Sequence, residues 1–549
     1  MPPDLPPNYY LDNVKILFSH IESTYSDILD ENLADFITHF NKLNESAQRL
    51  AVRLLNRRHL NFRQSKLNYP EIESIESALQ ELESAGFLSL NDAIDPTDFL
   101  RLFTKNELLA VIDDSSTFKH QRREVLDSAL LEPESADKIE RLKTIETIII
   151  LLVQEQYTIC QMIFFGNLNQ SMTDFVLRDL GLYQYENYRI DKNNRPFQSQ
   201  LEIQQRWLLY QLQTLLDLTD SNDSESLIEC FYCIPDDIVS TSNQFQLADR
   251  LRFSIARQVE RNSDVEKASK LYQQCQLPPA RERQVRILTA QQNYDEALSL
   301  CETILTNPFD ESESQFSQEF ASRLIRQRKL PARERFNPST NPHPIKPITL
   351  ILPQSDHVEL AVVEHYQSID SRGLCQYVEN SLFSGVLGLL IWDAIFDSIP
   401  GAFYHPFQHR PADFYHHDFM ANRKPIFDRL WQQIDRPELM RSLLHQSWES
   451  HHGILNPMVN WGALDLETIN LAVERIDPNH WLAIFKRILS DLRNNRTGFP
   501  DLVYFPSTGG YQLVEVKGPG DQLQKNQKRW MTYFDLHQIP YQVARVKWQ

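Results

Sequence analysis

Two acidic residues and a lysine near the end of the chain are the residues best suited to chemistry. Asp501 follows Pro500, and Glu515 and Lys517 stand on either side of Val516. Two ionised carboxylates that lie close together repel each other unless a cation lies between them. Carboxylate oxygens are hard ligands that suit Mg²⁺ or Mn²⁺, and such an ion beside a lysine can promote hydrolysis of a phosphodiester. These residue types therefore predict a metal-dependent phosphodiesterase site.

A β-hairpin is the element that can bring these residues together. Residues 502–505 and 511–514 are runs of β-prone side chains, and residues 506–510 between them have the composition of a turn. We expect Phe505 to pair with Tyr511 across this turn. That pairing fixes the register of the whole hairpin.

The register determines which side chains share a face. Antiparallel counting places Asp501 opposite Glu515, where Cβ atoms lie roughly 4.5 to 5.5 Å apart. Lys517 falls on the same side as Glu515 because side chains alternate along a strand, and Val514 and Val516 then face the core. The alternative is an ordinary charged hairpin, since a pattern this short arises by chance in many proteins.

A helix is predicted after the loop Gly518–Asp521. Its apolar side carries Leu523, Trp530 and Phe534, and Gln527 occupies the same side at helical spacing. A glutamine that faces a sheet is better explained by hydrogen bonds to site or phosphate groups than by core packing. We therefore add Gln527 to the candidate site.

The motif residues resemble those of a nuclease superfamily. Pro500, Asp501, the triplet Glu515–Lys517 and the segment Gln527–Trp530 resemble the PD-(D/E)xK, restriction-endonuclease-like superfamily, and specifically its virus-type replication-repair nuclease (VRR-NUC) domain. The resemblance implies a C-terminal α/β domain with this fold, preceded by mostly α-helical N-terminal and middle regions.

Further segments are similar to the Fanconi-associated nuclease family. The similarity lies in residues 175–186 and 389–396 and in Phe407, Gln408, Pro411 and Asp413, and it extends over most of the chain from about residue 40. The resemblance implies cutting of branched DNA, especially 5′ flaps, by endonuclease and 5′ exonuclease activity in DNA repair, including interstrand-crosslink repair.

The same resemblance assigns roles within the site. Asp501 and Glu515 match the metal-binding acids, the backbone carbonyl of Val516 matches a further ligand, and Lys517 matches the catalytic lysine. Two ions, Mg²⁺ or Mn²⁺, about 3.5 to 4 Å apart are expected. Gln527 completes the predicted catalytic set.

A fourth acidic ligand is implied by the resemblance alone. Glu379 stands at the start of a helix expected over residues 379–396, where the family places an additional acidic metal ligand. Glu359 and Glu364, in the preceding amphipathic helix, are the alternatives.

A basic segment near the N-terminus is a candidate DNA-binding surface. The net charge of the chain is −19, but residues 46–67 contain no acidic residue, and distribution matters more than the sum. The predicted DNA contacts there are Arg49, Arg53, Arg57, Arg58, Arg63 and Lys66. Arg49, Arg53 and Arg57 recur at four-residue spacing and are expected on one helix face. The alternative is a solvated face that pairs with the acidic segment 71–83.

Basic residues near the acidic motif are further candidates for phosphate contacts. Arg493 and Arg496 precede Asp501, and Lys525 and Lys528 lie on the predicted final helix. Such contacts position a duplex without reading its sequence.

Three domains are predicted. Residues 1–145 are interpreted as a helical DNA-binding domain, in which helices over 72–86 and 98–111 resemble winged-helix and SAP-like elements. Residues 146–340 are interpreted as packed helix pairs, weakly like tetratricopeptide repeats because residues 268–271 and 297–300 are similar. Prolines between 338 and 347 mark the start of the nuclease domain, residues 341–549.

Other patterns narrow the cellular setting. The six cysteines are scattered, which predicts a reducing compartment, and Cys230 and Cys233 lack a second pair for zinc. The histidines at 405, 409, 416 and 417 are assigned no metal, because prolines at 406 and 411 disfavour a helix there. The longest strongly apolar stretch, residues 148–153, is too short to span a membrane. A cytoplasmic bacterial protein is expected, or a nuclear one if the source is eukaryotic.

These observations favour a structure-selective DNA nuclease with branched or flap DNA as its partner. One alternative is a Holliday-junction resolvase, and another is a non-catalytic helical-repeat scaffold in DNA repair. Protein partners could bind the helical-repeat region, and the sequence leaves the oligomeric state open.

Overall fold

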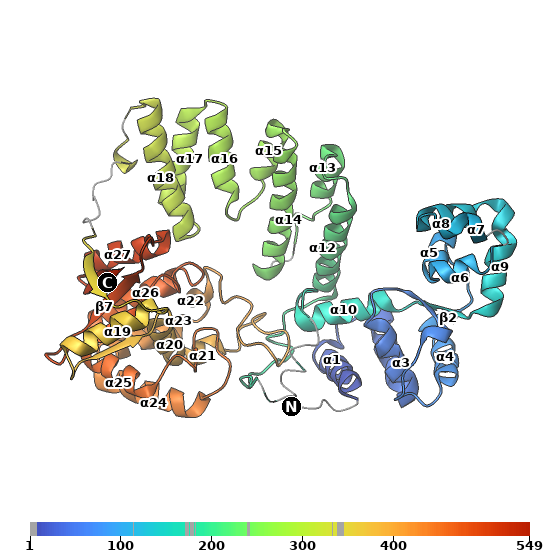
Figure 1. Ribbon diagram of the computed structural model, residues 1–549, viewed down its shortest axis with the longest axis horizontal. Helices are drawn as coiled ribbons and strands as arrows, with labels where there is room; N and C mark the ends of the chain where they lie inside the picture. The colour runs from blue at the N-terminus through green and yellow to red at the C-terminus, as the bar shows by residue number, and fades with distance from the viewer. Residues whose placement is uncertain are drawn as a thin grey trace. The chain divides into compact units, whose positions relative to one another are not determined.

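The computed structural model describes residues 8–112, 115–170, 175, 181, 183–238, 242–331, 333–336 and 345–549. The chain divides into two compact units. The first holds Met1–Leu182 and Phe197–Ile203, and the second holds Tyr183–Pro196 and Gln204–Gln549. Each unit is mainly helical, and each contains one sheet (Figure 1).

The first unit combines packed helices with a small antiparallel sheet. The sheet has the order β1-β3-β2, with strands Asn61–Arg63, Ile148–Leu151 and Leu88–Leu90. The helices before β2 are α1 (Tyr9–Tyr25), α2 (Glu31–Lys42), α3 (Glu45–Leu55) and α4 (Ile75–Ser84). Helices α5 (Pro96–Arg101), α6 (Lys105–Leu109), α7 (Ser115–Lys119), α8 (Arg123–Leu131) and α9 (Ala136–Ile145) lie between β2 and β3, and α10 (Gln154–Phe165) follows.

Two expectations for this unit are corrected by local structure, and a third observation concerns its boundary. The helix predicted over 98–111 is divided into α5 and α6, because Thr104 forms a capping box with Glu107. Helix α3 ends at Leu55, so Arg57 lies beyond the helix that carries Arg49 and Arg53. The predicted boundary at residue 145 falls just before β3, whereas β3 pairs with both β1 and β2 and the first unit continues past it.

The second unit begins with a series of paired helices. These are α12 (Gln200–Leu218), α13 (Ser224–Tyr232), α14 (Ser242–Arg261), α15 (Val265–Tyr272), α16 (Ala280–Ala290), α17 (Tyr294–Thr306) and α18 (Glu311–Arg328). Consecutive helices from α13 to α18 pack against one another and form a row in Figure 1. Ala268 and Ala297, from the two similar segments, are fully buried on α15 and α17. The packed helix pairs agree with the sequence, while a tetratricopeptide-like domain stays a prediction.

Parts of two predicted features lie outside the described residues. Residues 337–344 contain the boundary expected near residue 340, and most of residues 175–182 belong to a segment that resembles the nuclease family. The division into three domains stays a prediction.

A five-stranded mixed sheet forms the centre of the C-terminal region. Its order is β4-β8-β7-β6-β5, with strands Ile348–Leu352, Tyr541–Trp548, Gln512–Lys517, Leu502–Phe505 and Leu374–Tyr377. Strands β4, β8 and β7 are parallel, and β6 is antiparallel to both β7 and β5. This topology places the predicted hairpin, β6 and β7, inside the sheet.

Helices cover both faces of this sheet, and each face has its own core. Helix α19 (Val358–Ile369) packs on the face with Val514 and Val516. Helices α20 (Ser381–Leu390), α26 (Pro478–Ser490) and α27 (Lys525–His537) contribute to the core that contains Val503 and Leu513. The remaining helices are α21 (Trp392–Ile395), α22 (Phe419–Asn422), α23 (Lys424–Ile434), α24 (Pro437–His451) and α25 (Leu466–Arg475). Strand β7 is therefore buried on both sides, as in α/β folds.

Two further observations concern the whole described chain. All six cysteines are free. Within the residues that the structure describes, no helix combines the length and the apolar character needed to cross a membrane.

Candidate active site

The register of the hairpin is the predicted one. Leu502 lies opposite Val514, and Val503 lies opposite Leu513. The paired residues end at Leu502, and Asp501 lies in the bend directly before the strand. The extended register therefore sets Asp501 beside Glu515, at the point where β6 begins.

Asp501 is fixed through both its backbone and its side chain. Its carbonyl oxygen accepts the N–H groups of Val378 (2.9 Å) and Glu379 (2.8 Å). Its Oδ2 accepts the N–H of Val516 at 2.8 Å. Burial raises the pKa of Asp501 to about 6, although the Val516 N–H and the Lys517 charge act in the opposite direction. The carboxylate is thus held rigidly in a place that disfavours its negative charge.

Glu515 is completely buried, and one of its oxygens has no partner. Its Oε1 accepts hydrogen bonds from Gln527 Nε2 at 2.5 Å and from Lys517 Nζ at 2.6 Å. Its Oε2 is buried without a hydrogen-bond partner. Burial, followed by the charge of Asp501, raises the pKa of Glu515 to about 7. Because buried polar atoms are normally satisfied, this oxygen is suited to a bound cation.

Gln527 lies where the sequence places it, on the sheet side of α27. Its Oε1 accepts the N–H of Gln524 at 2.9 Å as part of a capping box, which leaves its Nε2 to donate to Glu515. Gln524 is the N-cap, so Leu523 precedes the helix and is not part of its predicted apolar stripe. Helix α27 therefore orients Glu515 through the same side chain that caps its first turn.

Glu379 lies beside Asp501, but it is not part of a helix. The expected helix over 379–396 begins only at Ser381 and ends at Leu390, before the short α21. Glu379 has a φ of 35°, in the left-handed region that a right-handed helix cannot include. Its Oε2 accepts the Tyr377 hydroxyl proton at 2.7 Å, and its Oε1 accepts from Asn380 Nδ2 at 3.2 Å.

Asn380 is a supporting residue that sequence reasoning missed. Its Oδ1 accepts the N–H groups of Gly498 (2.9 Å) and Phe499 (3.2 Å), so it ties the β5–α20 connection to the segment before Asp501. Its position directly before a helix is the signal that could have drawn attention to it. Tyr377, on the adjoining strand, was also missed.

The two alternative acids on α19 differ in their relation to the site. Glu359 is half-buried, and its charge raises the pKa of Asp501, as does that of Glu379. Glu364 is exposed. Glu359 and Glu379 are therefore the acids that influence Asp501 most directly among these candidates.

The donor set fits a hard divalent cation. Asp501 and Glu515 present two carboxylates, and Oε2 of Glu515 lacks a donor. In the part of the chain that the structure describes, no three His, Cys, Asp or Glu side chains are gathered as a complete ligand set. The carboxylate of Glu379 is bonded to Tyr377 and Asn380 instead, so its use as a ligand requires a change of side-chain rotamer.

Three of the six basic residues predicted to bind DNA in the first unit are engaged within the protein. Arg49 donates to the Glu71 carbonyl at 2.7 Å, and Arg53 forms an ion pair with the Glu71 carboxylate at 2.5 Å. Arg63 forms ion pairs at 2.9 Å with both Glu107 and Glu146. The alternative of pairing with the acidic segment is thus observed for Arg53.

Three cations of this set remain accessible. Arg57 and Arg58 are exposed in the turn after α3. Lys66 is 58% exposed, with its Nζ 3.2 Å from Glu107. Contacts of these residues with DNA stay predictions.

Arg496 and Arg493 have different environments although they are close in sequence. Arg496 donates to the carbonyls of Leu492 (3.0 Å) and Pro457 (2.7 Å) and to the Tyr415 hydroxyl (2.6 Å). Its guanidinium thus joins loops within the protein. Arg493 is exposed and lines a cavity.

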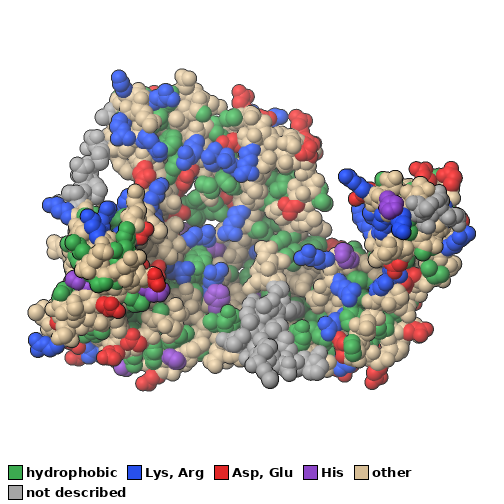
Figure 2. Space-filling view, viewed as in Figure 1, with side chains coloured by type: hydrophobic (Ala, Val, Ile, Leu, Met, Phe, Trp, Pro, Cys, Tyr) green, Lys and Arg blue, Asp and Glu red, His purple; other side chains and the backbone are tan. Residues whose placement is uncertain are grey.

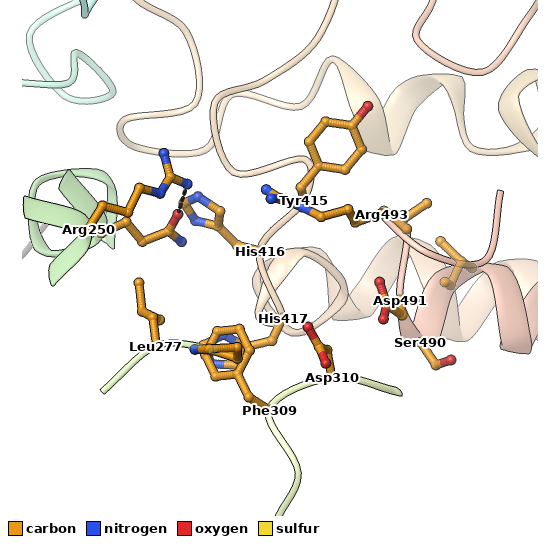
Figure 3. Close-up of a pocket in the computed structure, with 14 residues that line it drawn as sticks. Arg250, Leu277, Phe309, Asp310, Tyr415, His416, His417, Ser490, Asp491 and Arg493 are labelled. Carbon is orange, nitrogen blue, oxygen red and sulfur yellow. Dashed lines mark hydrogen bonds between the residues drawn. The ribbon is translucent and has the colours of Figure 1, made fainter. Parts of the chain in front are cut away.

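That cavity has a volume of about 140 Å³, and its lining contains both basic side chains and the acids Asp310 and Asp491. Figure 3 shows Arg250, Tyr415, His416, His417 and Arg493 around it. Burial, and then the charge of Arg493, lowers the pKa of Arg250. Arg250 also donates to Gln246 Oε1 at 3.1 Å.

The other two predicted basic residues lie on α27. Lys525 and Lys528 are exposed on the first turn of the helix.

His405 is completely buried, and its Nδ1 accepts the N–H of Phe407 at 3.2 Å. Burial lowers the pKa of His409.

The mixed sheet, its flanking helices and the carboxylate pair with Lys517 define a restriction-endonuclease-like nuclease of the PD-(D/E)xK class. Residues 435–548 match the VRR-NUC domain, and residues 8–89 match the domain described as "FAN1, HTH domain". The chain is 32% identical over 553 residues to the Fanconi-associated nuclease 1 homolog of Pseudomonas aeruginosa, covering 100% of this chain and 97% of that protein. The chain belongs to the Fanconi-associated nuclease family and is a DNA nuclease.

Other relatives and solved structures agree. The Fanconi-associated nuclease 1 homolog of Oryza sativa is 24% identical, over 95% of this chain and 61% of that protein. The crystal structure of paFAN1 bound to 5′-flap DNA with a 2-nucleotide flap and a gap has a TM-score of 0.81 at 30% identity, covering 100% of both chains. The complex with a 1-nucleotide flap has a TM-score of 0.79 and covers 99% of this chain.

Proposed function

We propose that this protein is a structure-selective nuclease that hydrolyses DNA near the 5′ end of flaps and uses Mg²⁺ or Mn²⁺. The observation that carries the proposal is the environment of Glu515. Its Oε1 is held by Lys517 and Gln527, while its Oε2 is buried without a donor beside Asp501. A carboxylate in this state is stabilised by a divalent cation.

Asp501 and Glu515 are the side chains that would hold the metal, with the Val516 carbonyl and the Glu379 carboxylate as further ligands. When bound, the metal would polarise a phosphoryl oxygen and lower the pKa of water. The proposal includes two ions, because four oxygen donors from Asp501, Glu515, Val516 and Glu379 suffice for a two-ion site with added water and phosphate.

The protein groups have separate tasks in hydrolysis. Lys517, whose side chain is only 11% exposed, presents its ammonium group to the negative charge that develops on the phosphate. Burial raises the pKa values of Asp501 and Glu515 to about 6 and about 7 in the metal-free protein, so a bound cation would favour the ionised pair as its ligands, and the attacking water would release its proton to solvent. The water oxygen forms the new P–O bond, the P–O bond to the leaving sugar breaks, and the leaving oxygen takes a proton from solvent.

Substrate binding is proposed to use the accessible cations. Arg250 and Arg493 line the cavity of Figure 3 together with His416, Asp310 and Asp491, and the exposed Arg493 would contact a DNA phosphate at its rim. Arg57, Arg58 and Lys66 would contact phosphates from the first unit, and Lys525 and Lys528 from the nuclease region. The paFAN1 complexes contain 5′-flap DNA, and this supports flap DNA as the substrate here.

A cleavage panel tests the proposal. Purified protein is incubated with 5′-flap, 3′-flap, four-way-junction and single-stranded DNA, each with Mg²⁺, Mn²⁺ or EDTA. We expect metal-dependent cutting that is fastest on the 5′ flap. Asp501→Asn and Glu515→Gln should abolish cleavage and retain DNA binding, whereas Glu364→Gln, an exposed control on α19, should keep full activity.

Each alternative has its own signature in this panel. Preferred cutting of the four-way junction would favour a Holliday-junction resolvase. Binding without cutting under all metal conditions would favour a non-catalytic scaffold. Full activity of Asp501→Asn with Mn²⁺ would contradict the proposed site.

A further inference from the structure

A basic groove lies next to the candidate active site, on the side of the sheet formed by β8 and β4. It has a volume of about 610 Å³. Its lining consists of the loop 518–523, Lys528 of α27, residues 545–547 of β8 and Thr349 of β4. All of these residues belong to the second unit. The groove is separate from the cavity of Arg250 and Arg493, with which it shares no lining residue.

The strand register places the groove directly beside the catalytic lysine. Lys517 of β7 pairs with Arg545 of β8, and Arg545 pairs with Thr349 of β4. Neighbouring strands lie about 4.8 Å apart, and paired residues point to the same face of the sheet. Lys517, Arg545 and Thr349 therefore form one row across three strands, and the next row holds Lys547 and Ile351.

The pattern of burial identifies this surface as the uncovered part of the active-site face. The adjacent residues of β8, Ala544 and Val546, are buried in the core against α19 on the opposite face. On the active-site face, α27 covers Glu515 through Gln527. Arg545 and Lys547 are exposed beyond it. The active-site face of the sheet is therefore exposed to solvent at β8.

The charge of the groove is unusual for this protein. The chain has a net charge of −19, yet Lys528, Arg545 and Lys547 all line or border this groove, and none forms an ion pair with a residue that the structure describes. Asp521 is the acidic residue of the lining, and its Oδ2 accepts the N–H of Gly518 at 3.1 Å. Figure 2 shows Lys and Arg side chains in the region of α27. Unpaired cations along a groove are suited to an anionic polymer.

The rim of the groove permits close approach by a backbone. Gly520 has a φ of 90° and open space around the position of a Cβ atom. Gly518 is the residue after Lys517, and it also lacks a side chain to fill the entrance. A glycine-rich rim of this kind lets another chain pass near the protein backbone.

We propose that this groove binds the sugar–phosphate backbone of the DNA strand that passes through the active site. Arg545 and Lys547, two residues apart and so about 6.6 Å apart along β8, contact consecutive phosphates next to the scissile one, and Lys528 contacts them from α27. Ile351, which is 65% exposed, lies beside the sugars. The inference rests on the proposed function and adds the binding track that aligns the strand with Lys517.

The test uses charge reversal on the full-length protein. The double variant Arg545→Glu/Lys547→Glu is compared with Arg429→Glu/Arg436→Glu, which makes the same charge change at two exposed arginines outside the groove. Binding of 5′-flap DNA is measured by fluorescence anisotropy in EDTA at several salt concentrations. We expect binding at least tenfold weaker for the groove variant only, and a salt slope reduced by about 1.4 to 1.8, as for two lost phosphate contacts.

Kinetics and a milder variant complete the test. In Mn²⁺ the groove variant should show a KM raised about tenfold, with a kcat within threefold of wild type, because no group that touches the reacting atoms has changed. If the charge reversal prevents folding, the milder double variant Arg545→Gln/Lys547→Gln is used in its place. An unchanged salt slope, or an equal loss of DNA affinity in the control variant, would overturn the proposal that this groove binds DNA. A wild-type protein that cuts no DNA would overturn the proposed function instead.

Discussion

Gln527 Nε2 donates a hydrogen bond of 2.5 Å to Oε1 of Glu515, and both side chains are buried. This contact ties the first turn of α27 to strand β7. It leaves Oε2 of Glu515 as the oxygen without a donor. The direction in which Glu515 presents its free oxygen therefore depends on the amide of Gln527.

Gln527→Leu removes this orientation while it keeps the volume of the side chain. We expect kcat to fall about 10- to 100-fold, as is typical when a partner of a metal-ligating group is lost. The Mn²⁺ concentration for half-maximal activity should rise in parallel, whereas KM for DNA should change little. Gln432→Leu, at an exposed position on α23, is the matched control. An unaltered metal dependence would show that α27 does not position Glu515.

The hydroxyl of Tyr377 would compete with a metal ion for the carboxylate of Glu379. It donates to Glu379 Oε2 at 2.7 Å, and Tyr377 as a residue is 50% exposed. A neutral hydrogen bond contributes about 1 kcal/mol net, and one to a charged group contributes more. If Glu379 turns to ligate a metal, this bond must break, so Tyr377→Phe should lower the half-saturating Mn²⁺ concentration about fivefold. Titration calorimetry with Mn²⁺ measures it directly.

The opposite result would have an equally specific meaning. Weaker Mn²⁺ binding by Tyr377→Phe would show that the hydroxyl holds Glu379 ready for the metal. Tyr377→Leu distinguishes the ring from the hydroxyl, because it alone removes the aromatic surface next to the site.

The raised pKa values of Asp501 and Glu515, to about 6 and about 7, predict a cost to stability when metal is removed. In the metal-free folded protein these groups bind protons more tightly than in the unfolded chain. Between their ordinary and raised pKa values the folded state therefore holds more protons, and the free energy of unfolding decreases as pH rises from about 4 to about 7. Added metal should reverse this loss by binding the ionised pair.

Glu515→Gln tests the sign of this effect. In EDTA at pH 8 the variant should unfold at a higher temperature than wild type. The free energy of unfolding of the nuclease region should rise by on the order of 2 kcal/mol. At pH 5 most of this gain should be lost, because Glu515 in the folded protein is then largely protonated and resembles glutamine. Differential scanning calorimetry at both pH values checks the prediction. A variant that is less stable at pH 8 would mean that the carboxylate stabilises the metal-free fold.

Strand alternation and a recognisable turn allowed the register of β6 and β7 to be predicted, because one slip would move Val514 and Val516 out of the core. Asp501 and Glu515 followed from that register. The structure of the Glu379 segment did not follow, since a left-handed residue before a helix leaves no clear sequence signal. Its contact with Asp501 depends on backbone hydrogen bonds between segments that are far apart in the chain.

The basic segment shows why charge spacing alone is a weaker guide. Arg49 and Arg53 recur at helical spacing, yet both contact Glu71, which lies outside α3 and comes close only in the folded unit. The exposed row of Arg545 and Lys547 was missed for a related reason. Its position beside Lys517 is a property of parallel pairing between β7 and β8, which sequence periodicity does not reveal.

These contacts predict that neighbouring arginines of the first unit act differently. Arg57→Glu/Arg58→Glu should weaken binding of flap DNA and reduce its salt slope by about 1.8 for two lost phosphate contacts, with little change in melting temperature. Arg53→Glu should instead lower the melting temperature, because it places a second acid beside Glu71 and removes the guanidinium 3.9 Å from the Tyr10 ring. Anisotropy and calorimetry on the same samples separate the two effects. A loss of DNA affinity confined to Arg53→Glu would restore the helix face of α3 as the DNA-binding surface.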